Sequence, residues 1–249
     1  MDREYYKKYY TFEREHWWFR VRAEIIRERI ENAIQPNDKL RILNIGAATG
    51  RSSELLAQYG HVTSVEYDAD CCTFLLEQLK MEVTQASITE LPFMDNSFDL
   101  VCAFDVIEHV EDDEKALDEL FRVCSKNGNI VITVPAFMQL WSRHDVVNHH
   151  KRRYLLSSLK KQVLQRRGEI IFASNFNSLL FVPVFLARKW MNLFPGWGTK
   201  NRNESDFVIM NNPFMNAVLH TIFSMEVVLL RIMRFPLGVS AILVSKKTG

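Results

Sequence analysis

The sequence predicts an α/β fold in which helices cover both faces of a mostly parallel sheet. Between residues 36 and 175, short apolar runs alternate with segments of helical periodicity. The first run, in residues 41–50, ends in a turn of small residues, and the next ends at Glu66, close to the spacing of a nucleotide-binding unit. The chain has 249 residues, 47% of them hydrophobic, so it can bury a sizeable core.

The chain divides into four segments. Residues 1–35 are expected to form a helical cap that ends before Pro36, and residues 36–177 to form the sheet and its helices. Residues 178–236 form an apolar helical insertion interrupted by a loop at 195–212, and residues 237–249 supply the last strand. The later elements of the sheet are expected in this order: a buried strand at 98–104, a helix from Asp112 or Asp113 to Asn127-Gly128, a strand at 129–134, a helix near 157–167 and a strand at 169–176.

The turn after the first strand has the composition of a ligand cradle. Asn44, Gly46, Ala48 and Gly50 fall at every second position. Glycine and alanine leave room for a ligand to approach the backbone closely. The carboxylate of Glu66, at the end of the second strand, can accept hydrogen bonds from both ribose hydroxyls. Together these features indicate a ribonucleoside site.

The kind of nucleoside follows from the pattern of small residues. A dinucleotide fingerprint needs glycine at its first, third and sixth positions, and the sixth position from Gly46 holds Arg51. The pattern acid-x-Gly-x-Gly-x-Gly fits better, with Asn44 in the place of the acid and Ala48 in that of the middle glycine. In this the chain resembles the class I S-adenosylmethionine-dependent methyltransferases, and the resemblance covers roughly residues 40–134.

The resemblance implies a fold, a cofactor and several binding residues. The fold is a Rossmann-like three-layer sandwich with strand order 3-2-1-4-5-7-6, in which residues 36–177 bind S-adenosylmethionine and the helical insertion precedes an antiparallel last strand. Ser87, where the family has an acid, and Ile88 are expected to face adenine. Asp105 follows the fourth strand, where family members touch cofactor or acceptor. His109 resembles a position that shapes the floor of the site.

The N-terminal helix carries a dense aromatic group that begins at His16. Packing on the sheet explains most of these side chains. The segment also resembles the leading helix of a bacterial methyltransferase subgroup with a His-Trp-Trp-Phe sequence. Trp18 is therefore expected near the sulfonium, which aromatic faces attract. Arg22, with Arg20 as second choice, is expected to bind the cofactor carboxylate, although either arginine could equally be a solvated helix charge.

Histidines gather in residues 144–154, after the fifth strand. Methyl transfer from a sulfonium needs no metal, and we predict none, but an oxygen acceptor must lose a proton. His144, His149 and His150 are therefore candidate bases, with Asp145 as a partner that orients the base. The following basic residues, from Lys151, either begin a solvated helix or hold an anionic acceptor.

Composition and the insertion limit the partners. Lys and Arg number 31 against 30 Asp and Glu, which gives no support to nucleic-acid binding. The four cysteines lack metal-ligand spacing, as in a reduced, cytoplasmic protein. A strongly apolar run of membrane-spanning length is not evident. Residues 178–236 are expected to form a lid that packs on the sheet. Alternatively, the lid opens an apolar channel or lies on a membrane surface through Trp190 and Trp197, and either alternative favours an apolar acceptor. The sequence leaves the oligomeric state open.

These observations predict methyl transfer from S-adenosylmethionine to a small or lipid-like acceptor, most simply at oxygen. Two alternatives stay open. A non-catalytic scaffold that binds the cofactor would tolerate the altered positions Asn44, Ala48 and Ser87. A nicotinamide-dependent oxidoreductase is disfavoured by Arg51 and by the missing third glycine.

Overall fold

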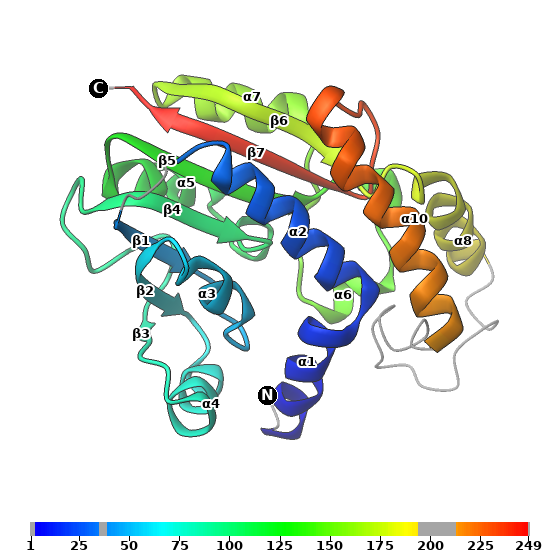
Figure 1. The fold of residues 1–249 in the computed structure, drawn as a ribbon, viewed down its shortest axis with the longest axis horizontal. Helices are drawn as coiled ribbons and strands as arrows, with labels where there is room; N and C mark the ends of the chain where they lie inside the picture. Colours follow the sequence, from blue (N-terminus) through cyan, green and yellow to red (C-terminus); the bar gives the residue numbers. More distant parts are fainter. Residues whose placement is uncertain (1–2, 35–38, 194–212, 249) are drawn as a thin grey trace.

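The computed structural model describes residues 3–34, 39–193 and 213–248, and these form a sheet of seven strands with helices on both faces (Figure 1). The strands are β1 (Leu40–Ile45), β2 (Gly60–Glu66), β3 (Thr84–Gln85), β4 (Phe98–Phe104), β5 (Cys124–Pro135), β6 (Gly168–Phe176) and β7 (Ser240–Lys247). Their order is β3-β2-β1-β4-β5-β7-β6, which confirms the expected topology. The last strand, β7, runs antiparallel to β5 and β6, and the other neighbours are parallel.

Helices separate into two layers that sandwich this sheet. The helices are α1 (Arg3–Glu15), α2 (Trp17–Glu31), α3 (Arg51–Leu56), α4 (Ala69–Leu79), α5 (Asp113–Val123), α6 (Arg143–Val147), α7 (Leu156–Gln165), α8 (Phe181–Leu193) and α10 (Pro213–Ile232), with short 3-10 turns η1 (Ile107–His109) and η2 (Met138–Leu140). Helices α2 and α10 cross one face, and α5 and α7 cover the other (Figure 1).

Alternation along each strand builds a core on both faces of the sheet. In β1, Ile42 belongs to the core under α2, whereas its neighbour Leu43 belongs to the core under α5. Successive side chains of a strand point to opposite faces, so an unbroken apolar run is buried on both sides. The same rule explains why β4 was recognisable as a buried strand from residues 98–104.

One expected boundary is wrong. Helix α5 begins at Asp113 with Asp112 as its N-cap, as expected, but it ends at Val123 and not at Asn127-Gly128. Cys124 already belongs to β5, where it pairs with Phe98 of β4 across an irregularity in the register. Sheet pairing therefore overrides the turn signal of Asn127, which adopts φ +65° inside the strand.

The N-terminal cap consists of two helices that meet at His16. The Nδ1 of His16 accepts a hydrogen bond from the Trp18 N–H at 3.3 Å and so caps α2. Burial lowers the pKa of this imidazole to about 4, so the ring is neutral near pH 7. The break at His16 lets α1 leave the sheet and pack beside α4, while α2 continues across the sheet.

The apolar insertion buries one face and exposes another. From α10, Leu219, Phe223 and Leu230 enter the core that α2 shares with the sheet. The buried carboxylate of Glu226 accepts hydrogen bonds from the Ser178 N–H at 2.6 Å and the Leu179 N–H at 2.7 Å, which ties α10 to the start of the insertion.

Within the described residues, α10 alone has the length and mean hydropathy (1.5) of a membrane-spanning helix. From the sequence, no strongly apolar run of spanning length was evident in this segment. Length and composition are weak evidence of a span, because core helices share them. Trp197 and the rest of the expected loop at 195–212 lie outside the described residues.

Candidate functional site

The small-residue turn after β1 is shaped by its backbone. The N–H groups of Gly46 and Ala47 both donate to the carbonyl of Val65, at 2.9 and 3.0 Å. Gly46 adopts φ +75°, and a Cβ there would lie 2.5 Å from Cγ2 of Val106. A larger residue would therefore be strained and would clash. Ala48, the departure from the glycine pattern, tolerates φ +47°.

Glu66 is held rigidly at the carboxyl end of β2. One carboxylate oxygen accepts the Ala48 N–H at 3.0 Å, and the other accepts the N–H groups of Tyr67 at 2.8 Å and Asp68 at 3.1 Å. Three of the about four lone-pair positions of this carboxylate are used here, so accepting both ribose hydroxyls requires that one hydroxyl share an oxygen with a backbone N–H. The acceptor oxygens of Glu66 therefore suit the hydroxyl groups of a nucleoside.

Two of the expected cofactor residues support the turn and do not face the cavity described below. The side chain of Asn44 is fully buried and donates to the hydroxyls of Ser52 and Ser53, both at 2.8 Å. Gly50, at φ +87°, begins α3. Neither Asn44 nor Gly50 is among the residues that line the cavity.

A cavity of about 1230 Å³ opens beyond this turn, at the carboxyl edge of the parallel strands. It exceeds the roughly 300–1,000 Å³ of common ligand sites, so it has room for two molecules. Its lining includes cofactor residues expected from the sequence: Trp18, Arg22, Gly46, Ala48, Glu66, Ser87, Ile88 and Asp105. The helical insertion adds an apolar wall: Leu180, Pro183, Val184, Ala187, Met191, Met215 and Leu219.

The aromatic helix places Arg22 at the end of β4. Its Nη2 lies 2.5 Å from a carboxylate oxygen of Asp105 and 3.0 Å from the hydroxyl of Thr133. The guanidinium carbon also lies 5.1 Å from the ring centre of Trp18. The structure thus brings Trp18, Arg22 and Asp105 together at the cavity. Arg20, the second choice, is exposed and does not line it.

Ser87 and Ile88 follow β3 on the same side of the cavity. The Ser87 hydroxyl lies 2.8 Å from that of Thr89 and accepts the Thr89 N–H at 3.2 Å. Ile88 is buried and packs in the core beneath α5. The pair therefore offers one polar and one apolar group to a flat ligand.

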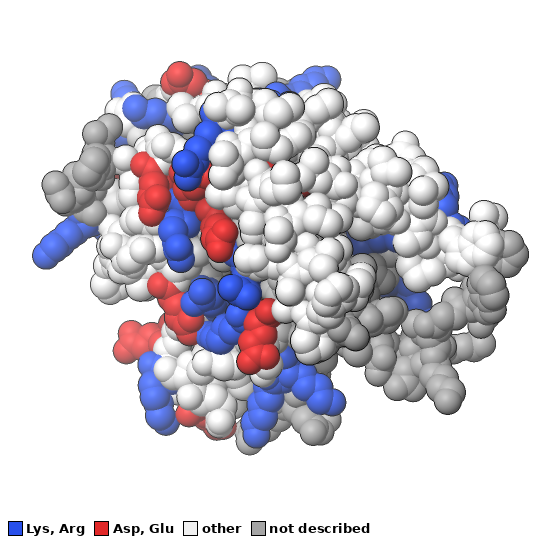
Figure 2. Space-filling view, turned by 45° about the vertical axis from the view of Figure 1, so that its right-hand side comes forward, with Lys and Arg blue, Asp and Glu red and all other residues white. Residues whose placement is uncertain are grey.

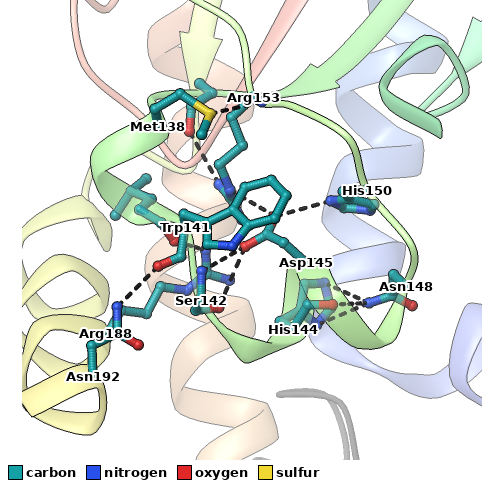
Figure 3. Close-up of polar contacts among 12 residues, drawn as sticks. Met138, Trp141, Ser142, His144, Asp145, Asn148, His150, Arg153, Arg188 and Asn192 are labelled. Carbon is teal, nitrogen blue, oxygen red and sulfur yellow. Dashed lines mark hydrogen bonds and ion pairs between the residues drawn. The ribbon is translucent and has the colours of Figure 1, made fainter. Parts of the chain in front are cut away.

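The candidate bases separate into two groups. His144 and His150 line the cavity, whereas His149 is exposed and lies outside its lining. His150 Nδ1 lies 2.9 Å from Asp145, the expected orienting partner (Figure 3). Burial alone would raise the pKa of Asp145, but the hydrogen bond from His150 and the guanidinium of Arg153 hold it well below its usual range.

The basic residues after these histidines are engaged with acidic partners. Lys151 pairs with Glu111 at 2.7 Å, Arg152 with Asp113 at 2.5 Å, and Arg153 with Asp145 at 2.7 Å. Only Arg153 of the three lines the cavity among the described residues. This arrangement favours a structural role for the run over recognition of an anionic acceptor.

The acidic lining of the cavity includes Glu13 and Glu108, which the sequence did not indicate as site residues. Glu13 of α1 accepts a hydrogen bond from the hydroxyl of Thr49, and burial raises the pKa of Glu13. Glu108 of η1 is fully buried, which raises its pKa well above the usual range, and the charge of Asp105 adds to the effect. An available signal was the position of Glu108 beside His109, just after a buried strand.

Comparisons with known proteins find similarity to methyltransferases. Residues 43–132 match a family model described as a methyltransferase domain. The demethylmenaquinone methyltransferase of Clavibacter sepedonicus is 37% identical over 105 residues, 40% of this chain and 43% of that protein. The phosphatidylethanolamine N-methyltransferase of Cereibacter sphaeroides is 30% identical over 99 residues, 37% of this chain and 49% of that protein. The matched regions span less than half of these curated relatives.

A solved structure supports the fold independently. A SAM dependent methyltransferase from Archaeoglobus fulgidus aligns with a TM-score of 0.54 over 96% of this chain and 99% of that one. The identity is 20%, so this likeness concerns the fold alone.

Proposed function

We infer that this chain, a class I S-adenosylmethionine-dependent methyltransferase through its domain at residues 43–132, transfers the methyl group of that cofactor to a lipid-like acceptor. The observation that carries the inference is the single cavity, which joins Glu66 and the small-residue turn to an apolar wall from α8 and α10. One end has the polar groups that a nucleoside needs. The other end offers apolar surface to a second molecule.

Cofactor binding is assigned to the residues around the turn. Glu66 accepts the ribose hydroxyls, the turn at Gly46 and Ala48 lies under the methionine part, and Ser87 with Ile88 faces adenine. Arg22 exchanges its ion pair with Asp105 for one with the cofactor carboxylate, beside Trp18. In the structure Asp105 lies 2.5 Å from Arg22, and the cofactor carboxylate would take its place.

The proposed chemistry is an in-line displacement at carbon. The bond from sulfur to the methyl carbon breaks as a bond from the acceptor oxygen forms, so the sulfonium becomes a neutral thioether and the acceptor loses its proton. We propose oxygen as the acceptor atom because imidazoles line the cavity at His109, His144 and His150. The role of His144 or His150 as a base remains a prediction, and His149 has no support from its position.

A lipid-like acceptor is favoured by the walls of the cavity, and some relatives are named for such acceptors. Apolar side chains of the insertion line the space beyond the turn, together with Arg188 of α8. Similar proteins include methyltransferases named for demethylmenaquinone and for phosphatidylethanolamine, which carry apolar tails. A glycine/sarcosine/dimethylglycine N-methyltransferase of Actinopolyspora halophila is also similar, at 32% identity over 117 residues, so the relatives do not select the acceptor class or the methylated atom, and both are left to be tested.

The function is tested by cofactor binding and by methyl transfer. At a hundredfold excess over Kd, S-adenosylhomocysteine should stabilise the protein by about 2.7 kcal/mol and raise Tm by roughly 5–10 °C, whereas NAD should not. A tritiated-methyl assay with lipid and aqueous extracts should then label a lipid. Stabilisation without any label would support the scaffold alternative, and stabilisation by NAD would support the oxidoreductase.

We also propose that the insertion meets a membrane surface, from which the acceptor is taken. Figure 2 shows a broad face poor in charged residues on the side of the molecule where α10 lies. Phe214, Val218, Met225, Val228 and Ile232 of α10 are all exposed there. An exposed apolar helix face next to an apolar cavity suits a protein that lies on, and does not cross, a bilayer.

Replacing Phe214 with aspartate should weaken binding to phospholipid vesicles about tenfold or more. Phe214 is 74% exposed, and burying such a side chain in an apolar phase contributes about 1.5–3 kcal/mol. Co-sedimentation with vesicles measures the change. Leu76→Asp, at an exposed leucine of α4, is the matched control and should bind like the parent. Equal binding of both variants would argue against contact through α10.

A further inference from the structure

Three side chains with metal-binding atoms converge in the cavity beside the cofactor turn. They are Glu108 and His109 of η1 and His150, which follows α6. One ligand atom from each lies within 4.8 Å of the others. The two segments are joined by a hydrogen bond from the Lys151 N–H to the Glu108 carbonyl at 2.7 Å. The backbone therefore fixes this convergence.

Glu108 has unsatisfied binding capacity. Its side chain is fully buried, yet neither carboxylate oxygen has a hydrogen-bond partner among the described residues. A buried carboxyl without a partner is costly, and such groups are commonly protonated, paired or bound to a cation. Glu108 also lines the cavity, so an ion could reach it.

The nearby guanidinium groups already have other carboxylates. Arg22 pairs with Asp105 at 2.5 Å, and Arg153 with Asp145 at 2.7 Å. Both arginines act on Glu108 through space, but neither donates a hydrogen bond to it. The two carboxylate oxygens of Glu108 are thus left without a hydrogen-bonded cation among the described residues.

His150 is oriented as a metal-binding histidine usually is. Its Nδ1 lies 2.9 Å from Asp145, which also accepts from Arg153 and from the Ser142 N–H at 2.8 Å (Figure 3). A carboxylate on one ring nitrogen fixes the tautomer and leaves Nε2 as the ligand atom. The ring of His109 lies 4.8 Å away, nearly perpendicular at 86°.

We propose that Glu108, His109 and His150 bind a divalent transition-metal ion of the zinc class. Two imidazoles and one carboxylate suit zinc and its neighbours, whereas magnesium prefers oxygen ligands alone. Three protein ligands leave a coordination position toward the cavity, which an acceptor oxygen can occupy. That last role rests on the proposed function and leaves His144 as the candidate base, because His150 then binds the ion, but ion binding itself does not rest on it. The proposal replaces the expectation from sequence that no metal is bound.

Ion binding is measured on the full chain after removal of metal by a chelator. Zn²⁺ should bind by calorimetry with one ion per chain, and Co²⁺ should give the visible absorption of a nitrogen- and oxygen-ligated ion. Mg²⁺ at the same concentration should give no heat. Failure of both Zn²⁺ and Co²⁺ to bind would overturn the proposal.

Variants assign the ion to this cluster. Glu108→Gln and His150→Gln should each weaken Zn²⁺ binding at least tenfold and alter the Co²⁺ spectrum. His61→Gln, at an exposed histidine of β2, is the matched control and should bind as the parent does. Parental affinity in both cluster variants would overturn the assignment. Circular dichroism identifies a variant that does not fold, and the other variant then decides.

S-adenosylhomocysteine binding separates this proposal from the function. Cofactor binding without ion binding would leave the methyltransferase proposal intact and remove the metal site. Ion binding without cofactor binding would support the metal site and contradict the methyltransferase proposal.

Discussion

Replacing Glu66 with glutamine should weaken the binding of S-adenosylhomocysteine by about a hundredfold or more. A hydrogen bond to a charged group contributes about 1.5–3 kcal/mol, and the carboxylate is proposed to accept two from the ribose. Glutamine cannot substitute without a second cost. Its NH₂ group would face either the N–H of Ala48 or those of Tyr67 and Asp68, all of which now donate to Glu66.

Calorimetry with S-adenosylhomocysteine measures this loss. Glu82→Gln removes the same charge from an exposed position in the loop before β3, so it should bind the cofactor product like the parent. Glu66→Ala removes all acceptors and should lose at least as much affinity as the glutamine variant. An unchanged Kd in both Glu66 variants would contradict the assigned cofactor site.

The sheet and its cofactor end were predictable because their signals are local in sequence. Gly46 needs a positive φ and has Val106 packed against it, so its identity is fixed by backbone geometry. Glu66 ends an apolar strand, and the carboxyl ends of parallel strands meet at one edge. Such constraints restrict the residue type at a position and its spacing from others, so they can be recognised in the sequence. Asn44 fits the pattern too, but its contacts with Ser52 and Ser53 give it a supporting place.

The rest of the site depends on packing between distant segments. No pattern near Glu108 in the sequence predicts that His150 lies beside it. The fold alone brings their ligand atoms together. The same holds for the ion pair of Arg22 with Asp105, which joins α2 to the end of β4. His144, His149 and His150 share one short stretch, yet of these three only His144 and His150 line the cavity, whereas His149 is exposed.

The insertion shows a different limit of sequence reasoning. Its helices are apolar on more than one face, so periodicity does not reveal which face is buried. In the structure α10 buries Phe223 at 0% exposure, while Phe214 on the same helix is 74% exposed. The contrast provides a test of the two roles proposed for one helix, as a wall of the fold and as a membrane contact.

Replacing Phe223 with alanine should lower the free energy of unfolding by about 3–5 kcal/mol. Its ring is stacked on Phe176 with centres 6.3 Å apart and meets Trp17 edge-on at 5.8 Å, so truncation leaves a cavity between α10, α2 and the sheet. Urea unfolding measures the loss, and Tm should fall by roughly 6–20 °C.

Met225→Ala is the matched control, because it truncates a large apolar side chain on the exposed face of α10. It should leave the free energy of unfolding within about 0.5 kcal/mol of the parent, as surface substitutions usually do. This control variant should instead weaken binding to vesicles. Phe223→Ala, measured well below its lowered Tm, should bind vesicles like the parent. If both alanine variants lost the same stability, α10 would be packed on both faces, and contact of its outer face with a membrane would have to be abandoned.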